Sequence, residues 1–407
     1  MGKPEIRFKG YTDEWEQRKL GDSCKLNGRI GFRGYTEKDI VTKEVGGVLT
    51  FSPTNIVENK LTMECKNTYI TREKYDESPE IKISNGDILF VKTGSTLGKS
   101  ALVTGLKEDA SINPQIVVMR VEKDTETFMS NVLITDGVMK QVAAVKIGGA
   151  VPTMTETELK NFTYFAPAEN GEKKKIGDYF RTLDNLITLH QRKCDEVKTL
   201  KKYMLQKMFP QNEQKVPEIR FEGFTEAWEQ RKFGDLGSVA MCKRIFKEQT
   251  SPEGEIPFYK IGTFGATPDA FISKELYEEY KSKFQYPNVG DMLISASGTI
   301  GRTVEYCGEE AYFQDSNIVW FKHDDRIDNS FLRCVYNIVK WNGIEGSTIK
   351  RLYNDNFLKT EFYMPTAGEQ SKIGAYFRGL DHLITLHQQK CEELKKIKKF
   401  MLQKMFV

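Results

Sequence analysis

The chain has 407 residues, of which 39% are hydrophobic and 29% charged, and its formal net charge is +3. This length exceeds what one hydrophobic core usually supports, so two or more domains are expected. Because the sequence has no run of 18 apolar residues and no apolar N-terminal stretch, neither a membrane span nor a signal peptide is expected. The seven cysteines form no Cys-x-x-Cys pair, which favours reduced thiols in the cytoplasm.

Two segments of the chain occur twice. Residues 4–22 recur as 217–235 with 14 of 19 positions identical. Residues 175–209 recur as 372–406 with 26 of 35 positions identical. The stretches between these repeats have similar lengths but largely different sequences. A duplicated scaffold with two dissimilar inserts predicts two related modules that act on different targets.

The first insert, residues 23–165, is rich in short apolar runs and turns, which predicts a mixed α/β (α+β) fold. The run Ile88-Leu89-Phe90-Val91 follows an Asn-Gly-Asp turn and predicts a strand, with residues 116–120 as its partner. Polar side chains able to contact base edges or phosphates cluster beside the ends of these strands. They are Lys92, Thr93, Ser95, Thr96, Lys99, Ser100, Asn113 and Gln115.

Neither this cluster nor the rest of the sequence shows a complete catalytic motif. Residues 93–100 resemble a phosphate-binding P-loop, but Gly94 and Gly98 enclose three residues where that motif needs four. The counterpart loop 298–303 is shorter and carries Arg in place of Lys. Only four histidines occur, and none is paired with a clear nucleophile. We therefore expect no catalytic and no cofactor-binding residues, and favour a basic, hydroxyl-rich turn.

The repeated segment 175–209 carries a heptad pattern of apolar residues, interrupted by Lys201, as Lys398 interrupts the second copy. At 1.5 Å per residue each helix would be about 50 Å long, and its narrow apolar stripe needs a partner. The other copy is the simplest partner, giving an antiparallel coiled coil with pseudo-twofold symmetry. The predicted seam includes Ile176, Phe180, Leu183, Ile187, His190, Ile373, Phe377, Leu380, Ile384 and His387.

Each helix also carries a histidine and a cysteine four residues apart near its midpoint, His190/Cys194 and His387/Cys391. An antiparallel pairing would bring these four side chains into one layer, which leaves a zinc site open. A packed polar layer that fixes the register is the favoured interpretation, so no metal site is predicted.

After Pro210, which ends the first helix, residues 210–216 form a polar linker, and the module 217–365 begins. It repeats the predicted strand pair as 292–295 and 318–322. By symmetry, the end of the second helix (366–407) should lie near the N-terminus and close a pseudo-circular arrangement. The candidate contact residues of this module are Ser297, Thr299, Arg302, Thr303, Gln314, Ser316, Asn317, Lys350 and Arg351. Segments 27–33, 242–244 and 347–351 are further candidates for backbone contacts.

This arrangement closely resembles the specificity subunit of type I restriction–modification systems, and the resemblance covers the whole chain. The Trp-Glu-Gln-Arg-Lys segments at 15–19 and 228–232 match that family, as do the Gly-Asp-(Ile/Met)-Leu strands. The strongest signatures lie in the helices and recur from Ile373 to Phe406. In the first copy they are Ile176-Gly177, Tyr179-Phe180, Leu183-Asp184, Ile187 with His190-Gln191, and Leu205-Gln206-Lys207-Met208-Phe209.

The resemblance implies that residues 1–167 and 217–365 are target recognition domains, each reading one half of a bipartite, asymmetric site in double-stranded DNA. It implies that helices 168–209 and 366–407 set the gap and dock two methyltransferase subunits, with two restriction subunits as optional partners. The chain would be non-catalytic and hold no cofactor. S-adenosylmethionine would belong to the methyltransferase subunits, and ATP and Mg to the restriction subunits. The alternative is a DNA-binding scaffold without methyltransferase partners.

Overall fold

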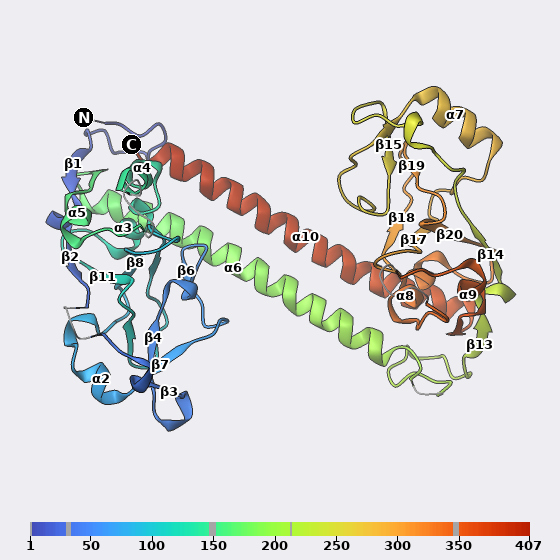
Figure 1. The fold of residues 1–407 in the computed structure, drawn as a ribbon, viewed down its shortest axis with the longest axis horizontal. Coiled ribbons are helices and arrows are strands. Elements are labelled where there is room, and N and C mark those ends of the chain that lie inside the picture. Colours follow the sequence, from blue (N-terminus) through green and yellow to red (C-terminus); the bar gives the residue numbers. More distant parts are fainter. Residues whose placement is uncertain (1, 30–33, 146–151, 212–213, 345–349) are drawn as a thin grey trace. The chain divides into compact units, whose positions relative to one another are not determined.

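The computed structural model divides into two compact units (Figure 1). Unit 1 comprises Met1–Gln191 and Gln389–Val407, and unit 2 comprises Arg192–Gln388. Because each long helix runs from one unit into the other, each unit contains one β-rich module and part of both helices. The structure describes residues 2–29, 34–145, 152–211, 214–344 and 350–407.

Unit 1 is built on a four-stranded antiparallel sheet whose middle strands are the two predicted ones. β8 (Ile88–Val91) pairs with β11 (Ile116–Val121). Every β8 side chain is buried because both faces of the sheet are covered. Alternate residues of β8 pack into two different apolar clusters, one on each face. The full strand order is β2 (Cys24–Asn27), β11, β8 and β9 (Ser100–Leu102).

Unit 1 also contains a second sheet, two strand pairs and five short helices among its described residues. A second four-stranded sheet has the order β10 (Ala110–Ile112), β4 (Val48–Phe51), β7 (Thr68–Ile70) and β3 (Ile40–Val41), with β10 and β4 parallel. Two small pairs complete the strands: β1 (Glu16–Lys19) with β12 (Thr163–Ala166), and β5 (Ile56–Val57) with β6 (Lys60–Leu61). The short helices are α1 (Leu20–Ser23), α2 (Arg72–Asp76), α3 (Glu126–Val132), α4 (Asp136–Val145) and α5 (Glu156–Asn161).

Unit 2 repeats this plan with a smaller second sheet. Its four-stranded sheet has the same order of equivalent strands: β14 (Gly237–Ala240), β20 (Ile318–His323), β17 (Met292–Ser295) and β18 (Thr303–Glu305). The predicted pairing of β17 with β20 is therefore confirmed. The second sheet has three strands, β16 (Phe271–Ile272), β15 (Ile256–Tyr259) and β19 (Tyr312–Phe313). β13 (Glu229–Lys232) pairs with β21 (Glu361–Met364), and the short helices are α7 (Lys274–Lys283), α8 (Asn329–Ile338) and α9 (Asn354–Lys359).

The long helices α6 (Asn170–Lys207) and α10 (Ala367–Met405) pack antiparallel, as predicted. In unit 1 the Lys398 ammonium lies 2.8 Å from the Asp184 carboxylate, and in unit 2 the Lys201 ammonium lies 2.5 Å from that of Asp381. Each lysine that interrupts the apolar seam thus pairs with an aspartate of the opposite helix. Of the predicted seam residues, His190, Ile384 and His387 are half-buried, and the others are buried: Ile176, Phe180, Leu183, Ile187, Ile373, Phe377 and Leu380.

Cys194 and Cys391, the two cysteines considered above as zinc ligands, lie near the midpoints of α6 and α10. The sulfur of Cys194 lies 3.9 Å from the Ile384 carbonyl oxygen, and that of Cys391 lies 3.8 Å from the Gln191 side-chain oxygen. Within the described ranges, no three His, Cys, Asp or Glu side chains gather as metal ligands would. All seven cysteines are free thiols. Among the described helices, none combines the length and the apolar character that a membrane crossing requires.

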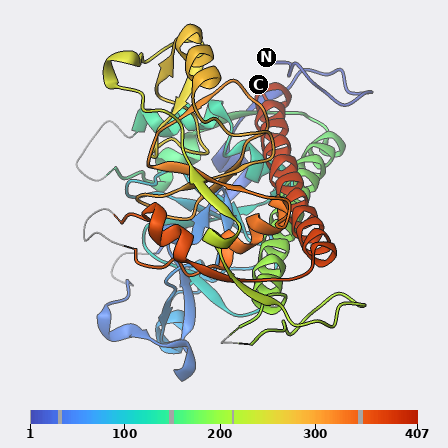
Figure 2. The same ribbon diagram turned by 90° about the vertical axis from the view of Figure 1, so that its right-hand side faces the viewer.

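The C-terminal end of α10 packs on the N-terminal segment of unit 1, which confirms the predicted closure of the chain. The Ile6 amide donates to the Lys404 carbonyl over 2.9 Å. The Phe406 ring lies 6.0 Å from the Trp15 ring and stacks on Phe128 at 5.6 Å. Figure 2 shows the two termini side by side, as Figure 1 does.

The end of α6 makes the same contacts inside unit 2. The Ile219 amide donates to the Lys207 carbonyl over 2.9 Å. The Phe209 ring lies 5.6 Å from Trp228 and stacks on Phe331 at 5.7 Å. The repeated Met-Phe ending therefore buries one phenylalanine ring in the core of each module. Burial of such rings is a large source of stability.

Candidate nucleic-acid interface

The polar cluster predicted in unit 1 lies on loop 1 (Lys92–Lys99), which connects β8 to β9. Loop 1 is closed by two backbone hydrogen bonds, from Gly98 N to the Val91 carbonyl and from Val91 N to the Lys99 carbonyl. Gly94 and Gly98 have φ values of +104° and +92°, a conformation that favours glycine. The amide of Gly94 also donates to the Pro152 carbonyl over 2.9 Å. These backbone hydrogen bonds, together with the buried Leu97 side chain, fix the loop.

The predicted residues of unit 1 differ in their accessibility. Ser100 and Asn113 are buried, and the Asn113 side chain exchanges hydrogen bonds of 3.0 and 3.1 Å with Gln115. The Lys92 ammonium is partly covered and lies 3.4 Å from the Glu156 carboxylate. Lys92, Thr93 and Thr96 are half-buried, whereas Ser95, Lys99 and Gln115 are exposed. The exposed residues can reach a ligand, and the buried ones support the loop.

Loop 2 (Ala296–Arg302) connects β17 to β18 in unit 2 and repeats the backbone geometry of loop 1. Ser295 N donates to the Arg302 carbonyl, and Gly301 N donates to the Ser295 carbonyl. The amide of Gly298 donates to the Lys350 carbonyl over 2.9 Å, as that of Gly94 does to Pro152. Loop 2 has one residue fewer than loop 1.

Equivalent positions in the two loops carry different side chains. The backbone amide of Lys92 donates to the Gln115 carbonyl, and that of Ala296 donates to the Asn317 carbonyl. Lys92 therefore corresponds to Ala296, and Gln115 corresponds to Asn317. Two modules with the same framework thus present different hydrogen-bonding groups at the same places.

Several predicted residues of unit 2 already have protein partners. The Arg302 guanidinium donates to the Phe264 carbonyl over 2.8 Å. The Gln314 side-chain oxygen accepts from Ile261 N, and the buried Ser297 hydroxyl donates to Asn317. Thr303, Gln314 and Asn317 are half-buried, whereas Thr299, Arg302, Ser316, Lys350 and Arg351 are exposed.

Each loop borders a groove whose other wall the sequence did not indicate. Groove 1, of about 400 Å³, lies between loop 1 with Gln115 and a wall formed by Ser52, Pro53, Thr54, Ile56 and Val57. Groove 2, of about 570 Å³, is bordered by Ala296 of loop 2 and lined by Ser316 and Arg351 together with Met241, Tyr353, Asn354, Asp355 and Lys359. Two sequence features could have indicated these walls: a Ser-Pro-Thr-Asn turn in the first and a Tyr-Asn-Asp run in the second.

Two arginines from the predicted backbone-contact segments are bound within the protein. The Arg29 guanidinium donates to the Ile112 carbonyl over 2.9 Å and lies over the Tyr35 ring, and burial lowers the pKa of Arg29. The Arg244 guanidinium lies 2.8 Å from the Asp315 carboxylate. Residues 30–33 and 347–349 of these segments lie outside the described residues.

The architecture is that of known restriction–modification specificity subunits. A solved S subunit from M. genitalium superimposes with a TM-score of 0.63 over 99% of each chain, at 13% sequence identity. A second structure, described as the structural basis of complex assembly and conformational transition of the type I R-M system, superimposes with a TM-score of 0.52 at 17% sequence identity. It covers 97% of this chain and 98% of its own. These similarities show that the fold is shared.

The sequence itself establishes the family. The profile of the type I restriction modification DNA specificity domain matches residues 12–199 and 225–396, so the chain belongs to that family and carries the domain twice. Members are non-catalytic specificity subunits.

Two relatives show how far the sequence similarity extends. A protein named as a type I restriction enzyme specificity subunit from Haemophilus influenzae is 58% identical over 143 residues, 35% of this chain and 37% of that protein. The chain thus matches little more than a third of that relative. The MjaX specificity subunit from Methanocaldococcus jannaschii is 23% identical over 95% of this chain and 91% of its own.

Proposed function

We propose that this chain selects the DNA target of a type I restriction–modification complex, with each module reading one half of a bipartite, asymmetric site. The observation that carries the proposal is the pair of loops with the same backbone hydrogen bonds and different side chains. A reader of two unlike half-sites needs this combination, because the docking geometry must stay the same while the hydrogen-bonding pattern changes.

The exposed members of the two sets are the proposed DNA contacts. Lys99 and Arg302 suit guanine or phosphate, Gln115 suits adenine, and the hydroxyls of Ser95 and Thr299 suit phosphates. The buried members hold the loops in place. This division explains why the candidate set mixes accessible and inaccessible residues.

The helices are the proposed spacer and docking surface. At 1.5 Å per residue, α6 with 38 residues and α10 with 39 residues are each about 57–59 Å long. Major-groove faces on one side of B-DNA recur about every 34 Å, within the reach of such helices. The domain limits 1–167 and 217–365 remain our prediction. Two methyltransferase subunits with S-adenosylmethionine would dock here, and two restriction subunits with ATP and Mg could join them.

Mapping of methylated adenines tests this function. The full chain is co-expressed with adenine methyltransferase subunits of the same system, and modified sites are mapped genome-wide. We expect one bipartite site, and replacing residues 23–165 with the insert of another family member should change one half only. The reciprocal exchange of 236–363 should change the other half. A chain that co-purifies with no methyltransferase subunit and leaves methylation unchanged would instead be a stand-alone DNA-binding scaffold.

A smaller exchange tests the loops themselves. The double variant Lys92→Ala, Gln115→Asn places the side chains of unit 2 at the equivalent positions of unit 1. We expect altered bases in the first half-site and an unchanged second half-site. Lys107→Ala, at an exposed lysine of the same module outside groove 1, is the control and should leave both halves unchanged.

A further inference from the structure

We infer that Asp184 in unit 1 and Asp381 in unit 2 are positioning residues that connect each reading module to the helix pair. Each aspartate binds the lysine of the opposite helix and also a cation supplied by the module of its own unit. This inference rests on the proposed function, because it concerns how the reading grooves are held.

In unit 1 the cation is Lys60, on strand β6. Its ammonium lies 3.7 Å from the Asp184 carboxylate and donates to the Thr188 hydroxyl over 2.8 Å and to the Asp184 carbonyl over 3.3 Å. The neighbouring turn adds a second contact, because the Glu58 carboxylate lies 3.6 Å from Lys395 of α10. The β5–β6 hairpin is therefore bound to both long helices.

The same hairpin forms a wall of groove 1. Val57 lines the groove and is the direct cross-strand partner of Lys60. Ile56, the other residue of β5, lines the groove as well. A shift of Lys60 relative to the helices would move the groove wall with it, because β5 and β6 are paired strands of one hairpin.

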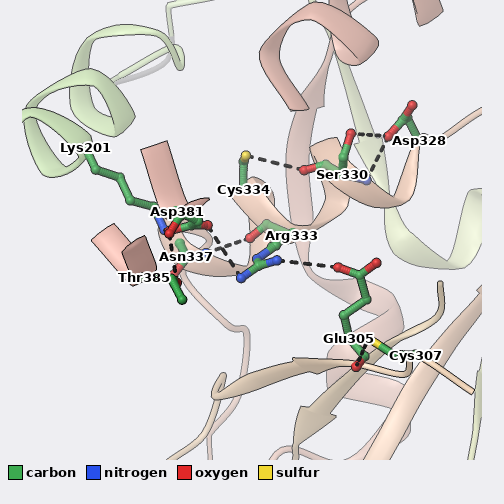
Figure 3. Close-up of polar contacts among 10 residues, drawn as sticks. All are labelled: Lys201, Glu305, Cys307, Asp328, Ser330, Arg333, Cys334, Asn337, Asp381 and Thr385. Atoms are coloured by element: carbon green, nitrogen blue, oxygen red, sulfur yellow. Dashed lines mark hydrogen bonds and ion pairs between the residues drawn. The ribbon is translucent and has the colours of Figure 1, made fainter. Parts of the chain in front are cut away.

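In unit 2 the cation is Arg333, on α8, as Figure 3 shows. Its guanidinium lies 3.5 Å from the Asp381 carboxylate on one side and 3.5 Å from the Glu305 carboxylate on the other. Glu305 ends β18, the strand that follows loop 2, and it pairs with Met292 of β17. The chain of contacts thus runs from the helix pair through α8 to the strand that begins where loop 2 ends.

The shared aspartate and the unrelated cations argue for a positioning role. The side chains of Lys201 and Lys398 are 21% and 17% exposed, whereas those of the module cations Lys60 and Arg333 are 42% and 37% exposed, so salt screens the module contacts more than the pairs between the helices. Lys60 lies on a hairpin and Arg333 on a helix, yet both reach the same helical position. The two divergent modules therefore contact the equivalent aspartates of the long helices through different residues.

The test removes the module's cation and leaves the helix pair intact. Lys60→Met and Arg333→Met retain most of the side-chain length, and Lys60→Arg and Arg333→Lys retain the charge. In the full chain co-expressed with its methyltransferase subunits, Lys60→Met should raise methylation of sites with one altered base in the half read by unit 1. We expect an increase of about fivefold, which matches the upper limit for a half-exposed ion pair and the lower end of what one mismatched base pair normally discriminates.

In Lys60→Met, discrimination at the second half-site should stay unchanged. In Arg333→Met, discrimination at the second half-site should fall and that at the first should stay unchanged. Lys60→Arg should restore at least half of the discrimination. Lys43→Met removes an exposed ion pair with Glu108 of unit 1, and Lys283→Met removes one with Glu279 of unit 2. Both controls should match the wild type. Equal relaxation at both half-sites, or none at either, would overturn the inference.

Hydrogen exchange tests the connection without DNA, and so separates it from the proposed function. Backbone amides of residues 52–61 should exchange about fivefold faster in Lys60→Met, while those of α6 keep their rates. If the wild type shows no bipartite methylation but this acceleration occurs, the proposed function fails and the structural connection stands. Unchanged exchange at 52–61 overturns the connection itself.

Discussion

Replacing Lys173 with methionine should destabilise unit 1 strongly. Lys173 lies in the first turn of α6 and forms an ion pair with Asp124, and the two side chains are 1% and 0% exposed. Methionine keeps most of the aliphatic volume but removes the charge. The Asp124 carboxylate would then stay buried without its cation, which is the costly way to break such a pair.

The magnitude follows from what Asp124 retains. Removing one partner of a buried ion pair usually costs about 3–5 kcal/mol. The Tyr164 hydroxyl still donates to Asp124 over 2.6 Å, and the Arg18 guanidinium lies 3.8 Å away. We therefore expect the lower end, about 3 kcal/mol. Lys174→Met, at the exposed neighbouring lysine, is the matched control and should change stability by less than about 0.5 kcal/mol.

Unit 2 suggests a second variant that should restore stability, because uncharged residues occupy the positions equivalent to Lys173 and Asp124. Gln370 occupies the repeat position of Lys173, and its amide donates to the carbonyls of Arg326 and Pro365 over 3.0 Å each. Buried Ile327 precedes the cap of α8, where Asp124 precedes the cap of α3. The double variant Lys173→Gln, Asp124→Ile should regain stability to within about 1 kcal/mol of the wild type.

Urea unfolding followed by circular dichroism gives the stability, and hydrogen exchange assigns the change to a unit. Both methods are needed because a chain of two units need not unfold in one step. Faster exchange should be confined to unit 1. A loss below about 1 kcal/mol in Lys173→Met, or a double variant less stable than the single one, would refute the argument.

The pH dependence of Lys173→Met should have the opposite sign to that of the wild type. Burial alone would raise the pKa of Asp124, but hydrogen bonds from Lys173 and Tyr164 outweigh it and hold the pKa below its usual 3.8. In the wild type this stabilisation is present above about pH 4 and is lost as the pH falls through the depressed pKa. Without Lys173, burial should raise the pKa, so the variant should regain stability as the pH falls from about 7 to 5.

Three further predictions concern backbone and helix. Gly177→Ala should destabilise by about 1–3 kcal/mol in thermal unfolding, because the new Cβ would lie 2.3 Å from the Thr127 hydroxyl and 2.9 Å from Phe128 N. Gly379→Ala, with no atom within 4 Å, should instead stabilise by up to about 1 kcal/mol, and equal effects would contradict this. Gly98→Ala, at φ +92° and 2.8 Å from Val142, should lose more stability than Gly10→Ala, which has similar φ and open space. Inserting about four residues, roughly one helical turn, within 200–202 should alter the unread gap in mapped methylation sites but neither half-site.

The sequence predicted the elements whose signals are local or repeated. The apolar runs 88–91 and 292–295 follow tight turns, and both are central strands. The helical seam implied the antiparallel pairing, since a narrow apolar stripe must be covered and the second copy was available. Closure of the chain followed from the duplication alone, and the contact between Ile6 and Lys404 bears it out.

The grooves could not be predicted from the sequence because they depend on long-range pairing. The wall at 52–57 lies opposite loop 1 because β4 pairs in parallel with β10, and strands so distant in sequence give no local pairing signal. Lys201 and Lys398 were expected to interrupt the seam. Their aspartate partners become visible only when the register between the helices is known.

The pattern of internal similarity has a physical cause. The backbone hydrogen bonds of loops 1 and 2 do not involve the exposed side chains, so those side chains can change without loss of the framework. The long helices depend on side-chain contacts, namely the stacked rings of Phe209 and Phe406 beyond their C-terminal ends and the ion pairs of Asp184 and Asp381 within them. Side-chain contacts of this kind tolerate little change, because volume and charge must both match. Repeats that stay alike in the helices and differ in the loops are therefore what a reader with exchangeable specificity requires.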